Sequence, residues 1–255
     1  MIYVEKSICP KEIQEDLDAQ KAKPEWDTIP EVPDSEQAKR LREEFFDKLN
    51  KDHLREVLVR EQHGLCIYCM SRIENVADSE DGAVIEHWYP LSKSKEKALQ
   101  YGNLFASCYG GQRSTVQDSR RICCCDAKKH DAIIQVDPCN PRMMEHIMYH
   151  SDGRIDFMKN YASPNIRRRL QHDLWHHLGL NGSVRNDGTL LADTATELVK
   201  KRKDAYQAAE AMLATLEMDG ELTSERVEEI IAEMQSKEIW DEYIGVTMFV
   251  LRQGV

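Results

Sequence analysis

Apolar residues recur at helical spacing in the first quarter of the chain. Leu41, Phe45 and Leu49 lie four residues apart, and Ser35 before them is a residue type that caps helix N-termini. A second apolar stretch ends at Gly64, and glycine is the residue type that most often follows a helix C-terminus. This pattern predicts two helices before residue 64.

The C-terminal part is also expected to be helical. Leu170 and Leu174 share one helix face, and that segment ends at Gly179. His172, His176 and His177 belong to the same segment and are interpreted as packing and surface residues. The i, i+3, i+4, i+7 spacing of an amphipathic helix recurs at Val227, Ile230, Ile231 and Met234.

Two other stretches lack this periodicity. Residues 1–34 hold four of the eight prolines and are predicted to form an extended arm with turns. Residues 64–140 are turn-rich, with a strand expected at about 83–89 and a helix at about 125–133. We therefore expect an α+β, mainly α-helical protein with three regions: an N-terminal arm and helices (1–63), a compact core (64–140) and a C-terminal helical region (141–255).

Composition narrows the class of protein. The 255 residues include 34 Lys and Arg against 45 Asp and Glu, a net charge of −11 that argues against coating nucleic acid by bulk charge. No apolar run approaches the ~18 residues of a membrane span, and the first residues do not resemble a secretory signal, so we expect a cytoplasmic protein. Residues 210–242 hold 11 acidic against two basic residues. That segment is interpreted as a solvated face or, alternatively, a docking surface for a partner.

Seven of the eight cysteines fall within residues 64–140. Cys66 and Cys69 are separated by two residues, the spacing of a knuckle that binds zinc through both sulfurs. The pair follows a helix, whereas redox pairs of this spacing normally open one, which favours zinc. Cys108 and one of the consecutive residues Cys123–Cys125 can complete the site, and Cys125 is preferred. The alternative is that these cysteines are small buried apolar residues.

Polar residues suited to catalysis lie between the two halves of this cysteine set. Glu86 and His87 stand side by side on the expected strand, Pro90 closes it, and Asn103 follows. Because side chains alternate along a strand, the two neighbours can share a site only where the strand twists or bulges.

The order of these residues resembles HNH endonucleases, which carry a ββα-metal motif beside a four-cysteine zinc knuckle. The flanking sequence is similar to the HNH subunits of Septu-type and retron-associated anti-phage defence systems. That closer resemblance uses segments 85–87, 103–108 and 125–129, with Asp137-Pro138 and Asp152-Gly153. The family match rests on ten residues over about a quarter of the chain: Cys66, Cys69, Glu86, His87, Pro90, Asn103, Leu104, Cys108, Cys125 and Lys129.

The resemblance implies a role for each residue. His87 is expected to be the general base, because an imidazole near neutral pH can accept a proton from water. Glu86 is expected to bind the catalytic Mg²⁺ or Mn²⁺ through its carboxylate. Asn103 is expected to hold the two strands together and orient His87. The four cysteines would hold a structural Zn²⁺, and an ATPase partner is implied by the defence branch.

This chain departs from the family pattern at two places. Family members usually have His or Asn directly after the last knuckle cysteine, whereas this chain has Asp126; His130, four residues later, competes with it as the metal ligand. A long insert, residues 109–124, separates Cys108 from Cys125. The insert and the helix after it are expected to contact nucleic acid through basic residues: Arg113, Arg120, Arg121, Lys128 and Lys129.

Three functions remain in view. A metal-dependent nuclease acting on DNA explains the most residues. The same chemistry on structured RNA such as tRNA is not distinguished by the sequence, because phosphate contacts dominate in both cases. A zinc-knuckle binding module without catalytic activity is the third, and Asp126 favours it.

Overall fold

Short antiparallel strand pairs, rather than one large sheet, organise the middle of the chain. The computed structural model describes residues 1–32, 35–76, 81–112, 122–185 and 189–255. Over these residues it contains three two-stranded sheets: β1 (Ala83–His87) with β2 (Leu104–Cys108), β3 (Ile147–Tyr149) with β4 (Ile155–Phe157), and β5 (Ser183–Val184) with β6 (Leu190–Ala192). Their brevity explains why strand periodicity is weak in the sequence.

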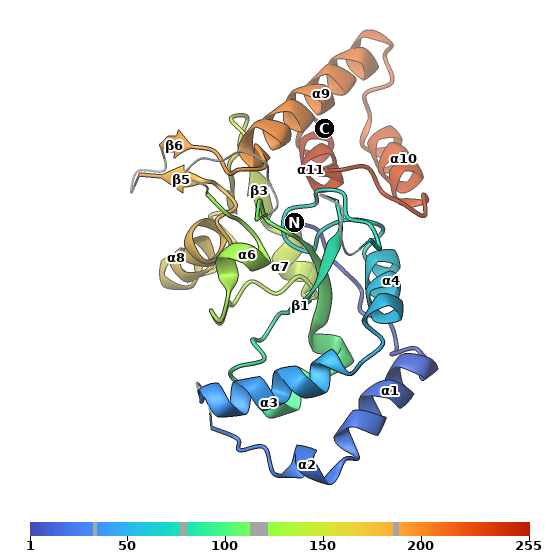
Figure 1. Cartoon of the computed structure of the whole chain (residues 1–255). Helices are drawn as coiled ribbons and strands as arrows, with labels where there is room; N and C mark the ends of the chain where they lie inside the picture. Colours follow the sequence, from blue (N-terminus) through green and yellow to red (C-terminus); the bar gives the residue numbers. More distant parts are fainter. Residues whose placement is uncertain (33–34, 77–80, 113–121, 186–188) are drawn as a thin grey trace.

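The β1–β2 hairpin lies at the centre of the molecule (Figure 1). Its register places Glu86 opposite Phe105 and His87 opposite Leu104. The buried Gln62, directly after α4 (Lys51–Glu61), forms two hydrogen bonds with the backbone of β2, as a neighbouring strand would. Its amide nitrogen donates to the Ala106 carbonyl at 2.8 Å, and its amide oxygen accepts the Ala106 N–H at 2.7 Å. The helix is thereby fixed against β2.

The N-terminal helices confirm one expectation and correct another. The Ser35 hydroxyl accepts the Ala38 N–H and begins the expected helix α3 (Glu36–Asp47). The extended arm predicted for residues 1–34 is wrong for residues 11–21 and 24–27, which are helical, whereas residues 1–10 precede the first helix. Pro10 immediately precedes the first, and Pro24 opens the second, positions where proline's missing N–H costs nothing. The helices are α1 (Lys11–Lys21) and α2 (Pro24–Asp27).

The middle of the chain is built from short helices. The helix expected over about 125–133 covers only α6 (Asp126–Lys129), because His130 adopts a positive φ of 47° that no α-helix can continue. The others are α5 (Lys95–Ala98), the 3₁₀ turn η1 (Tyr101–Asn103), α7 (Pro141–Glu145), α8 (Pro164–His172) and the π-helical turn η2 (Asp173–His177).

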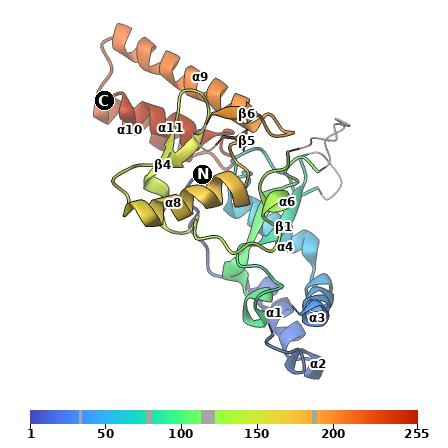
Figure 2. The same cartoon turned by 90° about the vertical axis from the view of Figure 1, so that its left-hand side faces the viewer.

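Three helices form the end of the molecule opposite α1–α3 (Figures 1 and 2). They are α9 (Leu198–Met218), α10 (Ser224–Gln235) and α11 (Ile244–Gln253). Val227 and Ile231 of α10 are buried against Leu251 of α11, as the amphipathic spacing predicts. Among the helices that the structure describes, none is both long and apolar enough to cross a membrane.

One hydrophobic core joins all three expected regions. It includes Phe45 of α3, Leu104 of β2, Leu174 of η2 and Ile244 of α11, each buried. The α+β class with predominant helix is confirmed. The boundaries at residues 63 and 140 stay predictions, and the shared core shows that each region buries apolar surface against the others.

Candidate active site and metal centre

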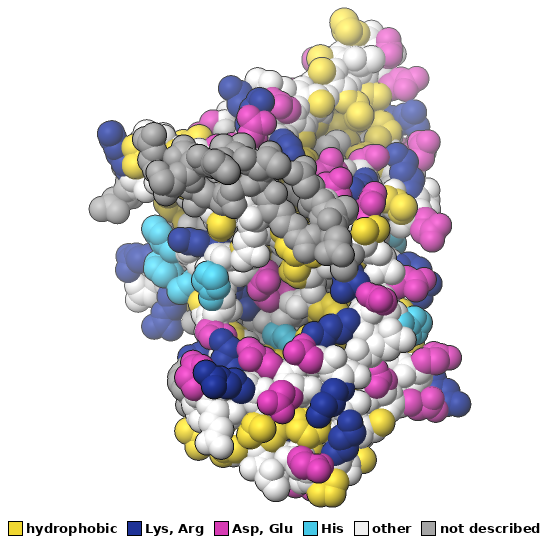
Figure 3. Space-filling view, viewed as in Figure 1, with side chains coloured by type: hydrophobic (Ala, Val, Ile, Leu, Met, Phe, Trp, Pro, Cys, Tyr) yellow, Lys and Arg dark blue, Asp and Glu magenta, His cyan; other side chains and the backbone are white. Residues whose placement is uncertain are grey.

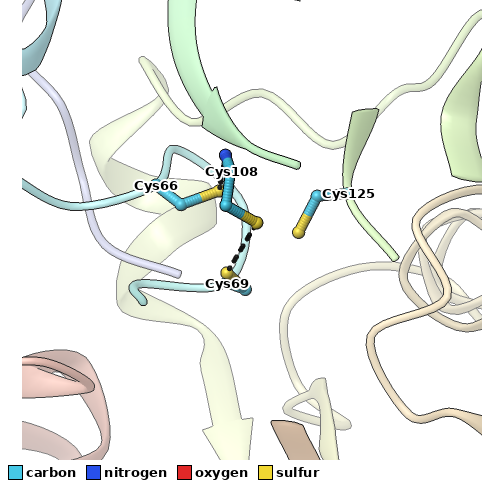
Figure 4. A group of neighbouring side chains, drawn as sticks. All are labelled: Cys66, Cys69, Cys108 and Cys125. Atoms are coloured by element: carbon cyan, nitrogen blue, oxygen red, sulfur yellow. Dashed lines mark hydrogen bonds between the residues drawn. The ribbon is translucent and has the colours of Figure 1, made fainter. Parts of the chain in front are cut away.

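Four cysteines from three segments of the chain meet at the end of the hairpin that carries Cys108 (Figure 4). The sulfurs of Cys66, Cys69, Cys108 and Cys125 all lie within 4.8 Å of one another. Zinc bound by four sulfurs at ~2.3 Å requires sulfurs about 3.8 Å apart, and those of Cys69 and Cys108 are 3.7 Å apart. This donor set therefore fits a tetrahedral Zn²⁺ ion.

Backbone turns explain how the sulfurs converge. The Met70 N–H donates to the Cys66 carbonyl at 3.1 Å, and Met70 itself has a φ of 66°, so the chain reverses directly after the pair. At the insert, the Cys124 N–H donates to the Gly110 carbonyl. Gly110 must be glycine there, because a β-carbon would lie 2.0 Å from the Cys124 carbonyl oxygen. The insert's ends are thus held together, which brings Cys125 to Cys108.

Backbone N–H groups also point at the sulfurs. Ser71 N–H donates to Cys69 Sγ at 3.4 Å, and Cys108 N–H donates to Cys66 Sγ at 3.3 Å. Such donors favour the thiolates that metals bind. Of the three consecutive cysteines, Cys125 belongs to the cluster of four, while the Cys124 sulfur lies 3.7 Å from that of Cys125.

A cleft of about 450 Å³ lies on the other side of β1, facing α3 and α4. Figure 3 shows the face of the molecule that includes this part of the surface. The expected catalytic residues Glu86, His87 and Asp126 all line the cleft, together with His130. Lys39 and Lys51 lie on its opposite wall, where they pair with Asp131 and Asp47. The hairpin and the N-terminal helices therefore enclose the candidate site jointly.

Glu86 is buried and held through one carboxylate oxygen. Its Oε1 accepts the Tyr68 hydroxyl at 2.7 Å and pairs with the Lys129 ammonium at 2.7 Å. Burial and the nearby negative charge of Asp126 raise the pKa of Glu86 to about 8, with Lys129 opposing them. Among the described residues, no N–H group or hydroxyl donates to the other oxygen, Oε2.

The Asp126 carboxyl lies within hydrogen-bond distance of Glu86. Two carboxylates this close repel each other unless a proton or a cation lies between them. Carboxylate oxygens are the ligands that Mg²⁺ and Mn²⁺ prefer. Glu86 and Asp126 therefore form a donor set that fits such an ion.

His87 lies at the end of β1, and its environment fixes its tautomer. Its Nε2 is 3.0 Å from the Ala98 carbonyl oxygen, an acceptor, so Nε2 carries the proton and Nδ1 keeps the free lone pair. The ring meets Phe46 edge to face at 4.5 Å. Burial, with the positive charges of Lys129 and Lys51, lowers the pKa of His87 to about 4, against a favourable bond to Ala98. The imidazole is thus neutral at physiological pH.

Asn103 holds the chain that leaves β1. Its side-chain oxygen accepts the Tyr89 N–H at 2.7 Å, and its amide nitrogen donates to the carbonyls of Tyr89 and Lys97 at 2.9 and 3.0 Å. Trp88 N–H donates to the Asn103 carbonyl at 3.0 Å. His87 directly precedes Trp88 and Tyr89, so these hydrogen bonds restrain the backbone that carries the imidazole.

The remaining residues expected at the site lie in different environments. Asp126 approaches Glu86, whereas His130, beyond the end of α6, lines the cleft with no described hydrogen bond to either carboxylate. Lys128 is exposed, but Lys129 is 2% exposed, and its ammonium donates to the His87 carbonyl at 2.9 Å besides pairing with Glu86. The basic residues expected in the insert lie outside the described residues: Arg113, Arg120 and Arg121.

Two residues at this site are missed by sequence reasoning. Tyr68 stands between the knuckle cysteines yet reaches Glu86, and nothing in the CxxC spacing indicates that direction. Arg42 of α3 is fully buried and donates to the carbonyls of Leu91 and Ser92 at 3.2 and 2.9 Å, which fixes one edge of the cleft. Arg42 is a charged residue on an otherwise apolar helix face, and that pattern in the sequence could have identified it.

Comparison with known proteins gives one informative similarity, and no family model matches the chain. Over 123 residues the chain is 28% identical to the "Retron Vc95 putative HNH endonuclease" of Vibrio cholerae serotype O1 biovar El Tor. The alignment covers 47% of this chain and 53% of that protein, so it spans about half the length of each. The similarity supports a relationship between this chain and HNH endonucleases.

Proposed function

We propose that this protein is a metal-dependent HNH endonuclease that hydrolyses phosphodiester bonds of DNA. The observation that carries the proposal is the cleft in which Glu86 and Asp126 place two carboxyls within hydrogen-bond distance beside a neutral imidazole, that of His87. These are the groups that phosphodiester hydrolysis requires: an acceptor for the proton of water and a cation site for the developing negative charge.

His87 would act as the general base through Nδ1. Because Nε2 donates to the Ala98 carbonyl at 3.0 Å, the free lone pair is on Nδ1, and the lowered pKa keeps it unprotonated. The bond to Ala98 would also stabilise the imidazolium once the proton has been taken. Asn103, by fixing Tyr89, would keep the ring at the position where the attacking water binds.

Glu86 and Asp126 would hold the catalytic Mg²⁺ or Mn²⁺. When bound, the ion supplies positive charge for the phosphate and the leaving 3′ oxygen. Tyr68 and Lys129 occupy Oε1 of Glu86 and so leave Oε2 for ligation. The four cysteines would hold the structural Zn²⁺. His130 remains the alternative partner of Glu86, because it lines the same cleft.

The nucleic acid would contact basic residues of the insert and of the helix after it, as the sequence indicates. Among the residues that the structure describes, the exposed Lys128 would make such a contact, whereas its neighbour Lys129 is buried. Arg113, Arg120 and Arg121 remain sequence-based expectations. Structured RNA is the alternative substrate, since phosphate contacts and a metal site serve either polymer.

We further propose that the protein acts in anti-phage defence with an ATPase partner. This rests on the resemblance to Septu-type and retron HNH subunits and on the similarity to one retron protein. The charge distribution agrees with it: residues 210–242, which include α10, hold 11 acidic and two basic residues and suit a protein partner better than nucleic acid.

The test is cleavage of supercoiled plasmid and of bulk tRNA by the purified chain, with Mg²⁺ or Mn²⁺ and with EDTA. We expect metal-dependent nicking of the plasmid that His87→Ala abolishes and that His146→Ala, at a half-buried histidine outside the cleft, leaves unchanged. Cleavage of tRNA alone would assign the RNA substrate. If wild-type protein with its co-purified ATPase cleaves neither polymer while still holding zinc, the protein is a binding module.

A further inference from the structure

Three histidines that belong neither to the cysteine cluster nor to the cleft gather on α8 and η2. His172 ends α8, and His176 and His177 lie in η2. The His172 ring centroid is 4.7 Å from that of His176 and 4.8 Å from that of His177. Figure 3 shows histidine side chains grouped over α8. Sequence analysis interprets them as packing and surface residues, whereas their arrangement has the features of a binding site.

The π-helical turn accounts for the grouping. The Leu178 N–H donates to the Asp173 carbonyl at 2.8 Å, an i to i−5 bond that widens the helix. In this turn residues five apart lie on one side, so His172 and His177 face each other, and Asp173 joins them. One ligand atom from each of these three residues lies within 4.8 Å of the others.

The backbone that carries these side chains is rigid. Leu174 is fully buried, and the Trp175 indole donates to the Ile155 carbonyl at 3.1 Å. The Asp173 carboxylate is fixed at Oδ2, which accepts the N–H groups of Gln135 and Val136 at 2.6 and 3.3 Å. Among the residues that the structure describes, none donates to Oδ1. The carboxylate is therefore oriented with one oxygen unused.

The imidazole nitrogens of this group also lack partners. No hydrogen bond joins His172, His176 or His177 to any residue in the described ranges. Some histidines elsewhere do find one: His63 Nδ1 lies 3.0 Å from the Glu238 carbonyl oxygen, and His146 Nδ1 lies 2.7 Å from that of Arg142. Clustered imidazoles with free lone pairs, around an oriented carboxylate, have the composition of a transition-metal site.

We propose that His172, Asp173 and His177 bind a second transition-metal ion, of the zinc class, distinct from that of the cysteine cluster. Two imidazole nitrogens and one carboxylate oxygen favour Zn²⁺, Co²⁺ or Ni²⁺ over Mg²⁺. Three protein ligands leave at least one coordination position for water or for an oxygen of a bound phosphate. The Cys125 N–H donates to the Leu178 carbonyl at 2.8 Å, so the site adjoins the segment that carries Cys125 and α6.

The test counts metal ions on the full chain and does not depend on nuclease activity. Protein whose cysteine cluster is first filled with one equivalent of Zn²⁺ is titrated with further Zn²⁺ by calorimetry in excess Mg²⁺, which occupies the proposed Glu86–Asp126 site. We expect one additional saturable site in wild type. His172→Ala removes an exposed ligand, and we expect it to weaken this site at least ~10-fold. The double variant His146→Ala/His150→Ala, which removes two histidines outside the cluster, should bind as wild type does.

Co²⁺ distinguishes the two sites spectroscopically. Cobalt in the cysteine cluster gives intense near-ultraviolet sulfur-to-metal bands, whereas cobalt bound by nitrogen and oxygen gives only weak visible bands. We expect His172→Ala to lose the weak bands and keep the intense ones, which also shows that the variant is folded. A wild-type protein that saturates at one Zn²⁺, or a second site that survives His172→Ala, would overturn the proposal.

Discussion

Replacing Tyr68 by phenylalanine tests whether the cysteine cluster positions the carboxylate of the proposed active site. The Tyr68 side chain is fully buried, and its hydroxyl donates to Glu86 Oε1 at 2.7 Å. Burial and the charge of Glu86 raise the pKa of this hydroxyl, so it stays protonated and can donate at any assay pH. The substitution removes one oxygen atom and leaves the ring that fills the space.

The size of the effect follows from the bond that is lost. A hydrogen bond to a charged group contributes about 1.5–3 kcal/mol. Every 1.4 kcal/mol changes an equilibrium constant tenfold, so the expected loss of Mn²⁺ affinity is about 10–100-fold. Second-shell substitutions at metal sites cost a similar amount. Lys129 remains on Oε1 in the variant, so Glu86 loses one of two donors rather than both.

Free Mn²⁺ measured by electron paramagnetic resonance gives the affinity directly. The matched control is Tyr101→Phe, which removes a hydroxyl that donates to Glu61, a glutamate outside the cleft, at 3.2 Å. We expect Tyr101→Phe to bind Mn²⁺ as wild type does, and both variants to retain their zinc. If Tyr68→Phe binds Mn²⁺ within twofold of wild type, the hydroxyl does not support the metal ligand and the reasoning fails.

The proposed metal ligands, the cysteine cluster and the buried ion pair each give one further prediction. The pKa of Glu86 is about 8, so Mn²⁺ binding below that pH releases the Glu86 proton. The affinity for Mn²⁺ should therefore rise as the pH increases toward 8 and then level off. Calorimetry in two buffers with different heats of ionisation should measure the proton that is released. Equal affinity at pH 6.5 and pH 8 would contradict this. Cys69→Ser should lose zinc and the cooperative thermal transition, whereas Cys123→Ser, outside the cluster of four, should keep both. Lys129→Met leaves the buried Glu86 carboxylate without its ion-pair partner and should lower the free energy of unfolding, measured in urea, by about 3 kcal/mol. The control Lys128→Met, at an exposed lysine, should lower it by less than ~0.5 kcal/mol.

The sequence predicts the elements whose cause is local. Ser35 caps α3 as expected, and the apolar spacing of Val227 and Ile231 identifies the buried face of α10. The meeting of Cys66 with Cys125 is also predictable, because metal-binding residue types at knuckle spacing constrain each other across a long insert. These features depend on a few neighbouring residues or on one shared ligand, so they can be predicted from the sequence.

Features that depend on distant contacts are not predictable in this way. The alternation of side chains along β1 argues against a site shared by Glu86 and His87, yet both line the cleft, because His87 is the last residue of the strand and α3 and α4 close over that end. His130, the competing candidate to Asp126, lies beyond the end of α6 because its positive φ stops the helix at Lys129, yet both residues line the same cleft. The direction of Tyr68 is set by packing alone.

The place of Tyr68 within the cysteine pair has a consequence for the order in which the proposed active site forms. The tyrosine that anchors Glu86 takes its position only when the turn from Cys66 to Cys69 has formed, and under the proposed function zinc closes that turn. A newly synthesised chain would thus acquire the ability to cut nucleic acid after zinc capture, not before. Under the proposed function, a cell would therefore be protected from the nuclease during its biosynthesis, for a time that the zinc supply sets.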